Sequence, residues 1–242
     1  MSEPRYGTLY GIGVGPGDPG LITLRAVEVL RRVPVVFAAR STKNHYSLAL
    51  NVARRFLSSS VRVERLGFPM TRDSAALERA WRDNARQVLA VLESGRDAAF
   101  LTIGDPLTYS TYGYLLTALK EMAPQAPVET VAGVTAYHAA AARLNLPLVE
   151  SRQSLLVVSG VNRPEEIEHL LSCGDTVVIM KTYRNYDRIV EALAALPPGS
   201  RTYTVSSCGL PDERIQEDAR RLRGQKMPYL SLVIVKGARE EG

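Results

Sequence analysis

Glycine-rich turns are the first feature of this sequence that could do chemistry. Near the N-terminus, glycines alternate with other residues in the segment GIGVGPGDPG, residues 11–20. Positions without a Cβ allow sharp turns and the close approach of another group. Gly15, Gly17 and Gly20 match the GxGxxG spacing of dinucleotide sites, where a helix N-terminus faces pyrophosphate. An ordinary helix start, capped by Asp18 and followed by Pro19, explains the same residues.

A second turn adds a carboxylate and a group of hydroxyls, in the segment LTIGDPLTYSTYG at residues 101–113. Pro106 holds Asp105 extended where a strand is expected to end. Asp105 offers a fixed negative charge to an ammonium, sulfonium or hydroxyl group, and Thr108, Tyr109 and the residues after them offer hydrogen-bond donors and acceptors. The alternative is an aspartate that caps the next helix, with hydroxyls at the surface.

A third turn, VAGVTA at residues 131–136, again follows an expected strand and opens a helix rich in small residues. Backbone amides at a helix start can bind the polar edge of a ligand without a charged side chain. An ordinary connection between a strand and a helix would have the same residues.

Alternating strands and helices must position these turns. Short apolar runs alternate with helical patterns, which predicts an α/β fold with a largely parallel sheet and ligand sites beyond the carboxyl ends of its strands. Two prolines within residues 123–127 predict a boundary between domains at 1–123 and 124–242. The clearest helix follows Asp73 or Thr71 as its cap. The expected strands cover residues 8–14, 33–38, 61–66, 98–103, 128–131, 154–159, 176–180, 202–206 and 229–235.

Composition excludes several classes of protein. The 242 residues are 45% hydrophobic and 23% charged, with a net charge of +5 but without the dense basic stripe of a nucleic-acid binder. Cys173 and Cys208 have no partners at the spacing of a zinc site, so we expect no metal and a reducing cytoplasm. No apolar run approaches the roughly 18 residues of a membrane span.

Taken in order, the three turns resemble the tetrapyrrole methylase family, whose members methylate corrin and sirohaem precursors with S-adenosylmethionine. The resemblance lies in GxGxGPGDPxLxTxxA from Gly11, GDPxxYST from Gly104 and AGVTAYHAAAARLNLPL from Ala132. Within the family, the segments FPMTRD at 68–73, YSTY at 109–112 and PDE at 211–213 are most similar to the precorrin-2 C-20 methyltransferase branch.

This resemblance implies two α/β domains with a ligand cleft between them, a fold distinct from that of Rossmann-type methyltransferases. It implies a homodimer that binds S-adenosylmethionine, releases S-adenosylhomocysteine and holds a tetrapyrrole in a trough whose floor includes Gly13 and Gly15. Carried over by motif, the residues expected to contact the methyl donor are Pro16, Ile103, Gly104, Asp105, Thr108, Thr111, Thr135, Ala136, Met180 and Cys208.

The expected reaction depends more on positioning than on acid–base chemistry. An electron-rich meso carbon of a reduced tetrapyrrole can attack the methyl group directly, and Asp105, Tyr109 and Asp73 are candidates for removing the proton afterwards. A carboxylate-rich macrocycle favours basic side chains around the trough, for which Arg40, Lys43 and Arg72 are candidates. Each of these three is equally consistent with a solvated surface charge.

Three alternatives to methylation at carbon 20 remain compatible with the sequence. The GxGxxG match and Arg40, which follows the expected strand at 33–38, are compatible with an NADP-dependent oxidoreductase, whereas an NAD site would need an acidic residue there. A tetrapyrrole carrier without catalytic activity is the second possibility. Methylation at a different position of the macrocycle is the third, and it lies nearest because it stays within the family.

Overall fold

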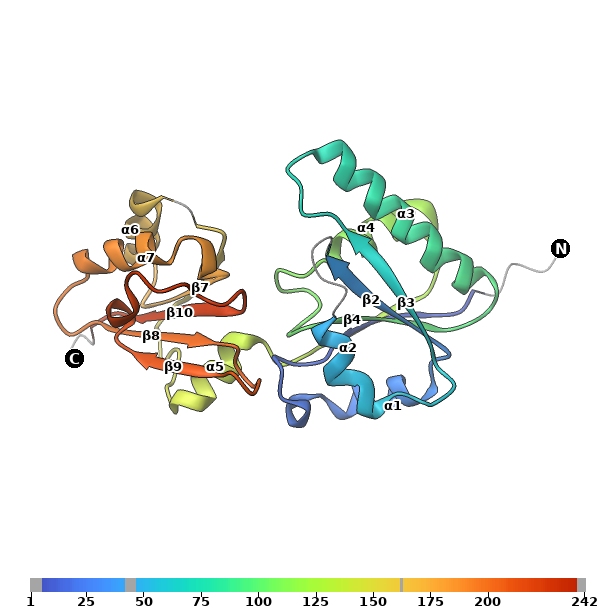
Figure 1. Ribbon diagram of the computed structural model, residues 1–242, viewed down its shortest axis with the longest axis horizontal. Helices are drawn as coiled ribbons and strands as arrows, with labels where there is room; N and C mark the ends of the chain where they lie inside the picture. The colour runs from blue at the N-terminus through green and yellow to red at the C-terminus, as the bar shows by residue number, and fades with distance from the viewer. Residues whose placement is uncertain (1–5, 42–46, 162, 239–242) are drawn as a thin grey trace. The chain divides into compact units, whose positions relative to one another are not determined.

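The computed structural model of the chain describes residues 6–41, 47–161 and 163–238 (Figure 1). The chain divides into two compact units, Met1–Thr135 and Ala136–Gly242. Each unit is a sheet with helices packed against it, so the expected pair of α/β domains is confirmed.

The first unit is built on a five-stranded sheet with the order β3-β2-β4-β1-β5, and its pairings are all parallel. Its strands are β1 Leu9–Gly13, β2 Val35–Ser41, β3 Arg62–Phe68, β4 Ala98–Thr102 and β5 Val128–Val131. Because parallel strands share one direction, their carboxyl ends lie at one edge of the sheet. All three glycine turns follow strands of this sheet, namely β1, β4 and β5.

Helices cover both faces of this sheet, with α1 and α2 on one face and α3 and α4 on the other (Figure 1). Each face of the sheet packs against its pair of helices in a separate hydrophobic core, and the side chains of β1 reach both. Leu9 packs with residues of α3 and α4, and Ile12 packs with residues of α1 and α2; both side chains are fully buried. These helices are α1 Leu24–Arg32, α2 Leu48–Ala53, α3 Ser74–Glu93 and α4 Tyr112–Met122, with 3-10 turns η1 Pro19–Leu21 and η2 Arg54–Phe56.

Two helix starts agree with the sequence patterns. Asp73 caps α3, with its Oδ1 accepting a hydrogen bond from Ala76 N at 3.2 Å. Asp18 caps the short turn η1, while Thr23 Oγ1 caps α1 by accepting from Ala26 N at 3.2 Å. The start that the sequence placed after Asp18 is therefore a 3-10 turn, and the α-helix itself begins at Leu24.

The division between the units falls after Thr135, whereas the sequence placed it after residue 123. The strand β5 pairs with β1, and its Glu129 accepts a hydrogen bond from Arg25 of α1 at 2.7 Å. Ala126 is buried in the core of the first unit. The prolines at 124 and 127 therefore mark the turn from α4 into β5 within one domain.

The second unit contains a five-stranded sheet with the order β6-β7-β10-β8-β9. Only β6 and β7 run parallel, because β10 returns between β7 and β8 antiparallel to both, and β8 and β9 form a hairpin. The expectation of largely parallel pairing therefore holds for the first sheet and is wrong for the second. The strands are β6 Leu155–Ser159, β7 Thr176–Met180, β8 Arg201–Ser206, β9 Arg214–Glu217 and β10 Ser231–Lys236.

The core of this unit lies between the sheet and the helices α6 and α7, where Val177, Ile179 and Val233 pack against Ile189. The remaining elements are α5 Ala136–Leu144, α6 Pro164–Ser172, η3 Thr182–Arg184, α7 Tyr186–Ala192, η4 Leu193–Ala195 and η5 Ala219–Leu222. Among the described residues, no helix meets the length and apolarity that a membrane span requires. Those residues also contain no cluster of His, Cys, Asp and Glu side chains suited to a metal ion.

Candidate functional site

The three glycine turns meet at the carboxyl edge of the first sheet. Gly15 and Gly104 form an isolated antiparallel bridge, with Gly104 N donating to Gly15 O at 2.7 Å. A Cβ at Gly13 would lie 2.6 Å from Gly104 O and 2.8 Å from the Cα of Gly133. The turns after β1, β4 and β5 are therefore in backbone contact, which only residues without side chains permit. We call Gly13, Gly15, Gly104 and Gly133 the glycine contact.

Backbone conformation gives a second reason for glycine at two of these positions. Gly15 has a φ of 79° and Gly104 a φ of 71°, both in the left-handed region. A Cβ on Gly104 would have only Val134 O within reach, at 4.0 Å, so conformation and not crowding selects glycine there.

Asp105 organises two of the three turns. Its Oδ2 accepts a hydrogen bond from Gly133 N at 3.0 Å, which connects the β4 turn to the β5 turn. Its Oδ1 accepts from Leu107 N at 2.9 Å and from Thr108 Oγ1 at 3.4 Å within its own loop. The carboxylate therefore fixes the shape of this edge.

The alternative in which Asp105 caps α4 is wrong. Thr111 precedes α4 without a capping side-chain bond, and the neighbouring Ser110 Oγ instead accepts from Tyr112 N at 3.1 Å. The Ser110 hydroxyl also bonds to Thr102 Oγ1 at 2.8 Å, so it connects the end of β4 to the start of α4.

The first unit brings together seven of the residues expected to contact the methyl donor. All seven follow β1, β4 or β5 at the glycine contact or continue the β4 loop to the start of α4. Pro16, Gly104 and Thr135 are buried, and the others are partly exposed. The seven residues are Pro16, Ile103, Gly104, Asp105, Thr108, Thr111 and Thr135.

The second unit carries the other three. Met180 ends β7 and pairs with Leu232 of β10, whose other neighbour is Val205 of β8. Cys208 follows β8 and is buried, with 6% of its surface exposed. Met180 and Cys208 therefore lie at the same edge of the second sheet, while Ala136 begins α5.

Lys181 directly follows Met180 in an unusual conformation. Its φ is 58°, in the left-handed region that residues with a side chain seldom adopt. Loss of hydration around the ammonium lowers the pKa of Lys181. This residue was not singled out from the sequence, where a lysine after a strand has no distinguishing signal.

The candidate residues for the substrate lie along the same edge of the first sheet. Gly13 and Gly15 belong to the glycine contact, Arg40 lies near the end of β2, and Arg72 follows β3. Because β2 and β3 are neighbours, with Arg40 paired to Gly67, both exposed arginines lie near the carboxyl edge. Lys43 lies outside the described residues.

Exposed apolar side chains at this edge were missed. Met70 follows β3 with 51% of its surface exposed, and Leu107 in the β4 loop has 65% exposed. Tyr109 of the same loop, which the sequence already indicated as a candidate, has a φ of 50° and is 45% exposed. Large apolar groups left in water at the end of a parallel sheet are typical of a ligand surface. The signal available in the sequence was their position just after expected strands.

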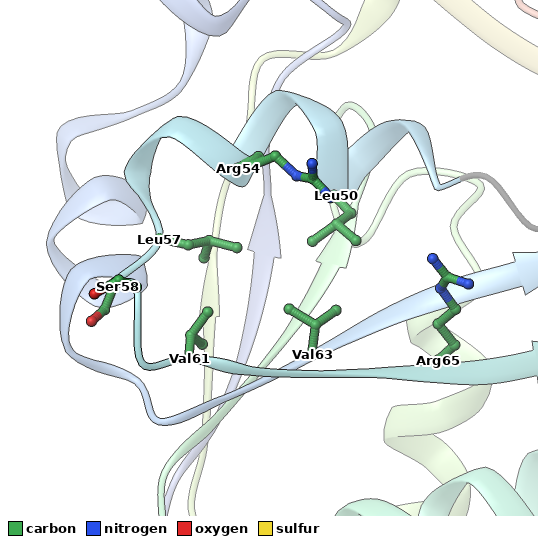
Figure 2. A pocket seen from close by; sticks show the side chains of 8 residues that line it. Leu50, Arg54, Leu57, Ser58, Val61, Val63 and Arg65 are labelled. Carbon is green, nitrogen blue, oxygen red and sulfur yellow. The ribbon is translucent and has the colours of Figure 1, made fainter.

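A groove elsewhere in the first unit contains none of the expected residues. It has a volume of about 570 Å³ and lies between the α2–η2 segment and the first half of β3. Leu50, Leu57, Val61 and Val63 face one another across it, with Arg54 and Arg65 on its wall (Figure 2). Its position along the first half of β3 separates it from the glycine contact.

The segment after β1 differs from a dinucleotide fingerprint. In that fingerprint the glycines open the helix directly. Here the turn η1 and the cap Thr23 stand between Gly20 and α1. Of the three glycines in the GxGxxG match, Gly15 belongs to the glycine contact, and the helix does not start where the fingerprint places it, which weakens the case for an NADP site.

Comparison with known proteins agrees with this geometry. The family model of the tetrapyrrole (corrin/porphyrin) methylases matches residues 8–221. The cobalt-precorrin-2 C(20)-methyltransferase of Salmonella typhimurium is 34% identical over 95% of this chain and 96% of its own length. The precorrin-2 C(20)-methyltransferase of a Sinorhizobium species is 32% identical over 98% of each chain.

A solved structure shares the fold. Uroporphyrin-III C-methyltransferase from Thermus thermophilus, in complex with S-adenosylhomocysteine, superposes with a TM-score of 0.66 at 24% identity. The match covers 95% of this chain and 97% of that one. With the family model spanning both units and relatives above 30% identity over nearly the whole length, the chain belongs to the tetrapyrrole methylases.

Proposed function

We propose that this chain is a C-methyltransferase of corrin biosynthesis, which transfers a methyl group from S-adenosylmethionine to carbon 20 of precorrin-2 or of its cobalt complex. The observation that carries the proposal is the glycine contact, at which turns from three strands meet and order the residues expected to hold the methyl donor. The relatives with full-length similarity are named for that reaction.

The groups around the glycine contact fit S-adenosylmethionine. Backbone amides and carbonyls of the β4 and β5 turns provide polar edges, while the partly exposed Ile103 provides apolar surface. Asp105 adds a negative charge suited to a cationic ligand. When bound, S-adenosylmethionine supplies a methyl group on a positively charged sulfur. The chain's own contribution is to hold both reactants in line and to exclude water.

The edge over β3, β2 and β4 fits the tetrapyrrole. Arg40 and Arg72 present guanidinium groups that can bind carboxylates with two hydrogen bonds each. Met70 and Leu107 offer apolar surface to the face of a macrocycle. We propose that the macrocycle lies on this apolar surface with its carboxylate arms on the arginines.

Of the three candidates for removing the proton after methylation, we favour Tyr109 over the carboxylates of Asp73 and Asp105. Asp73 is committed to capping α3, and Asp105 accepts three hydrogen bonds within the turns. The Tyr109 side chain lies in the exposed part of the β4 loop. A Tyr109→Phe variant with unchanged kcat would remove this residue from the mechanism.

Methylation of the two candidate substrates tests the reaction. The purified chain is incubated with precorrin-2 or its cobalt complex and with methyl-labelled S-adenosylmethionine, and the product is analysed by mass spectrometry and carbon NMR. We expect one added methyl group, on carbon 20, and the better substrate identifies the metal state. Label on another carbon would overturn the proposed position.

Binding measurements distinguish a methyltransferase from an oxidoreductase and from a carrier. Calorimetry should detect S-adenosylhomocysteine binding without binding of NADPH. Binding of NADPH alone would support an oxidoreductase and contradict the proposal. Tight tetrapyrrole binding without methyl transfer from S-adenosylmethionine to any precorrin would instead identify a carrier.

We also infer a cytoplasmic homodimer. The resemblance to the family supports the dimer, and size-exclusion chromatography with light scattering measures it. Cys173 and Cys208 are free thiols, which supports a reducing compartment.

A further inference from the structure

The acidic pair Asp212–Glu213 is a motif that the proposed reaction leaves unexplained. It lies in the loop from Ser207 to Glu213 that joins β8 to β9. This loop also contains the buried Cys208. The pair therefore lies next to the edge of the sheet where β7 and β8 end.

Both carboxylates hold the start of this loop. Glu213 Oε2 accepts a hydrogen bond from Gly209 N at 2.6 Å, and Asp212 Oδ2 accepts from Ser207 Oγ at 2.9 Å. Ser207 and Gly209 both have left-handed backbones, with φ of 52° and 78°. Such a turn is unfavourable for Ser207 unless its surroundings enforce it. The hydrogen bonds that Ser207 and Gly209 donate to the acidic pair hold the backbone in this conformation on both sides of Cys208.

Glu213 also connects the loop to α5. Its Oε1 lies 3.3 Å from Arg143 Nε, and only 21% of the Glu213 side chain is exposed. Arg143 belongs to α5, whose first residue is Ala136. One carboxylate therefore joins two segments of the second unit that carry expected contacts to the methyl donor, the Cys208 turn and α5.

We propose that Glu213 is a positioning residue for the methyl donor, which acts by fixing the backbone around Cys208 and coupling it to α5 through Arg143. This inference rests on the proposed function, since it assumes that Ala136 and Cys208 face the donor. Glu213 takes no part in the transfer step. Its removal should therefore weaken the binding of donor and product alike, which raises the KM for S-adenosylmethionine and leaves kcat nearly unchanged.

Three variants separate the two contacts. Glu213→Ala removes both. Glu213→Gln keeps an amide oxygen for Gly209 N but loses the charge that faces Arg143, and Arg143→Met removes the same charge pair from the other side. Glu217→Gln is the matched control, because Glu217 is an exposed acid at the opposite end of β9 from this loop.

The measurements are the dissociation constant of S-adenosylhomocysteine by calorimetry, the KM and kcat, and thermal unfolding. We expect an increase in Kd of about tenfold for Glu213→Ala and about threefold for Glu213→Gln and for Arg143→Met, with the control within a factor of about two. The double variant Glu213→Gln/Arg143→Met should bind S-adenosylhomocysteine no more weakly than either single variant, because both substitutions remove the same ion pair.

The outcomes are distinguishable. If the wild-type chain binds no S-adenosylhomocysteine, the proposed function fails before Glu213 is tested. If the wild type binds but all Glu213 and Arg143 variants keep its Kd, the positioning role is wrong and the function stands. A lowered unfolding temperature with unchanged Kd and KM would assign Glu213 a purely structural role and also overturn the inference. Should Glu213→Ala fail to fold, Glu213→Gln and Arg143→Met decide the matter.

Discussion

Replacing Asp105 by asparagine would break the connection between two glycine turns without changing the size of the side chain. Oδ2 accepts from Gly133 N at 3.0 Å and Oδ1 from Leu107 N at 2.9 Å. An asparagine side chain has one acceptor oxygen and one NH₂ group. Whichever way it rotates, one of these two backbone amides faces a donor in place of an acceptor.

The size of the effect follows from these two bonds. A hydrogen bond to a charged group contributes about 1.5 to 3 kcal/mol, and a buried donor without a partner costs about 1 to 3 kcal/mol. Asp105 is only half-buried, so water replaces part of what is lost. We expect the free energy of unfolding to fall by about 1 to 2 kcal/mol and the Tm to fall by roughly 2 to 8 °C.

The same change should weaken binding of the methyl donor. The turn at Gly133 leads directly to Thr135, so a displaced Gly133 moves an expected donor contact. A loss of about 1.4 kcal/mol in binding would raise the dissociation constant of S-adenosylhomocysteine about tenfold. Asp105→Ala should likewise destabilise the fold and weaken binding, because it removes the acceptor for Gly133 N and for Leu107 N.

Thermal unfolding and calorimetry with S-adenosylhomocysteine measure both effects. Asp83→Asn is a suitable control, because Asp83 lies on the surface of α3 with 63% of its side chain exposed. The reasoning is refuted if Asp105→Asn keeps both the Tm and the Kd of the wild type. A lowered Tm with an unchanged Kd would confirm the structural role and remove the link to the donor.

Three further predictions concern stability, each measured by urea unfolding. Gly13→Ala should lower the free energy of unfolding by about 1 to 3 kcal/mol, because its Cβ would collide with the backbone of Gly104 and of Gly133. Gly67→Ala has open space around the new Cβ and should change the free energy of unfolding by less than about 0.5 kcal/mol. Equal effects of the two substitutions would contradict the glycine contact. Hydrogen bonds from Ser154 lower the pKa of Asp175, so their stabilisation is present above about pH 3.9 and is lost as the pH falls through the lower folded value; Asp175→Asn should therefore reduce the difference in stability between about pH 5 and about pH 3. Lys236→Ala should cost about 2 to 4 kcal/mol, because the buried ammonium bonds to a backbone carbonyl and pairs with a carboxylate, and a loss below about 0.5 kcal/mol would contradict that role.

The sequence predicted most of the strands but not all of their partners. Apolar runs identified β1 to β8 and β10, because buried strands need Val, Ile and Leu at consecutive or alternating positions. The strand β9, with the sequence RIQE, has one apolar residue and gains its hydrogen bonds from β8 alone. A short exposed edge strand carries no hydrophobic pattern, so the hairpin could not be seen in advance.

The position of the glycine turns could be predicted, but the role of Asp105 in joining them could not. Turns after neighbouring parallel strands must lie at one edge, which made their meeting predictable once the parallel fold was assumed. The bond from Gly133 to Asp105 spans 28 residues of chain and depends on the rotation of one side chain. Met70 and Leu107 were missed because single exposed apolar residues in loops have no periodicity.

Each of the two units uses an acidic side chain to fix a glycine turn, which is why we expect substitutions of Asp105 and of Glu213 to weaken binding of the methyl donor. In the first unit, the Asp105 carboxylate accepts a hydrogen bond from the backbone amide of Gly133, and in the second, the Glu213 carboxylate accepts one from that of Gly209. Each acid thus uses its charge to fix the shape of a glycine turn at the end of a sheet. Transfer of a methyl group from a sulfonium to a carbon nucleophile needs alignment before it needs a base. A chain that fixes its turns with carboxylates holds its ligands in place before the reaction, and disturbing either turn should weaken the binding of the methyl donor and of its product alike.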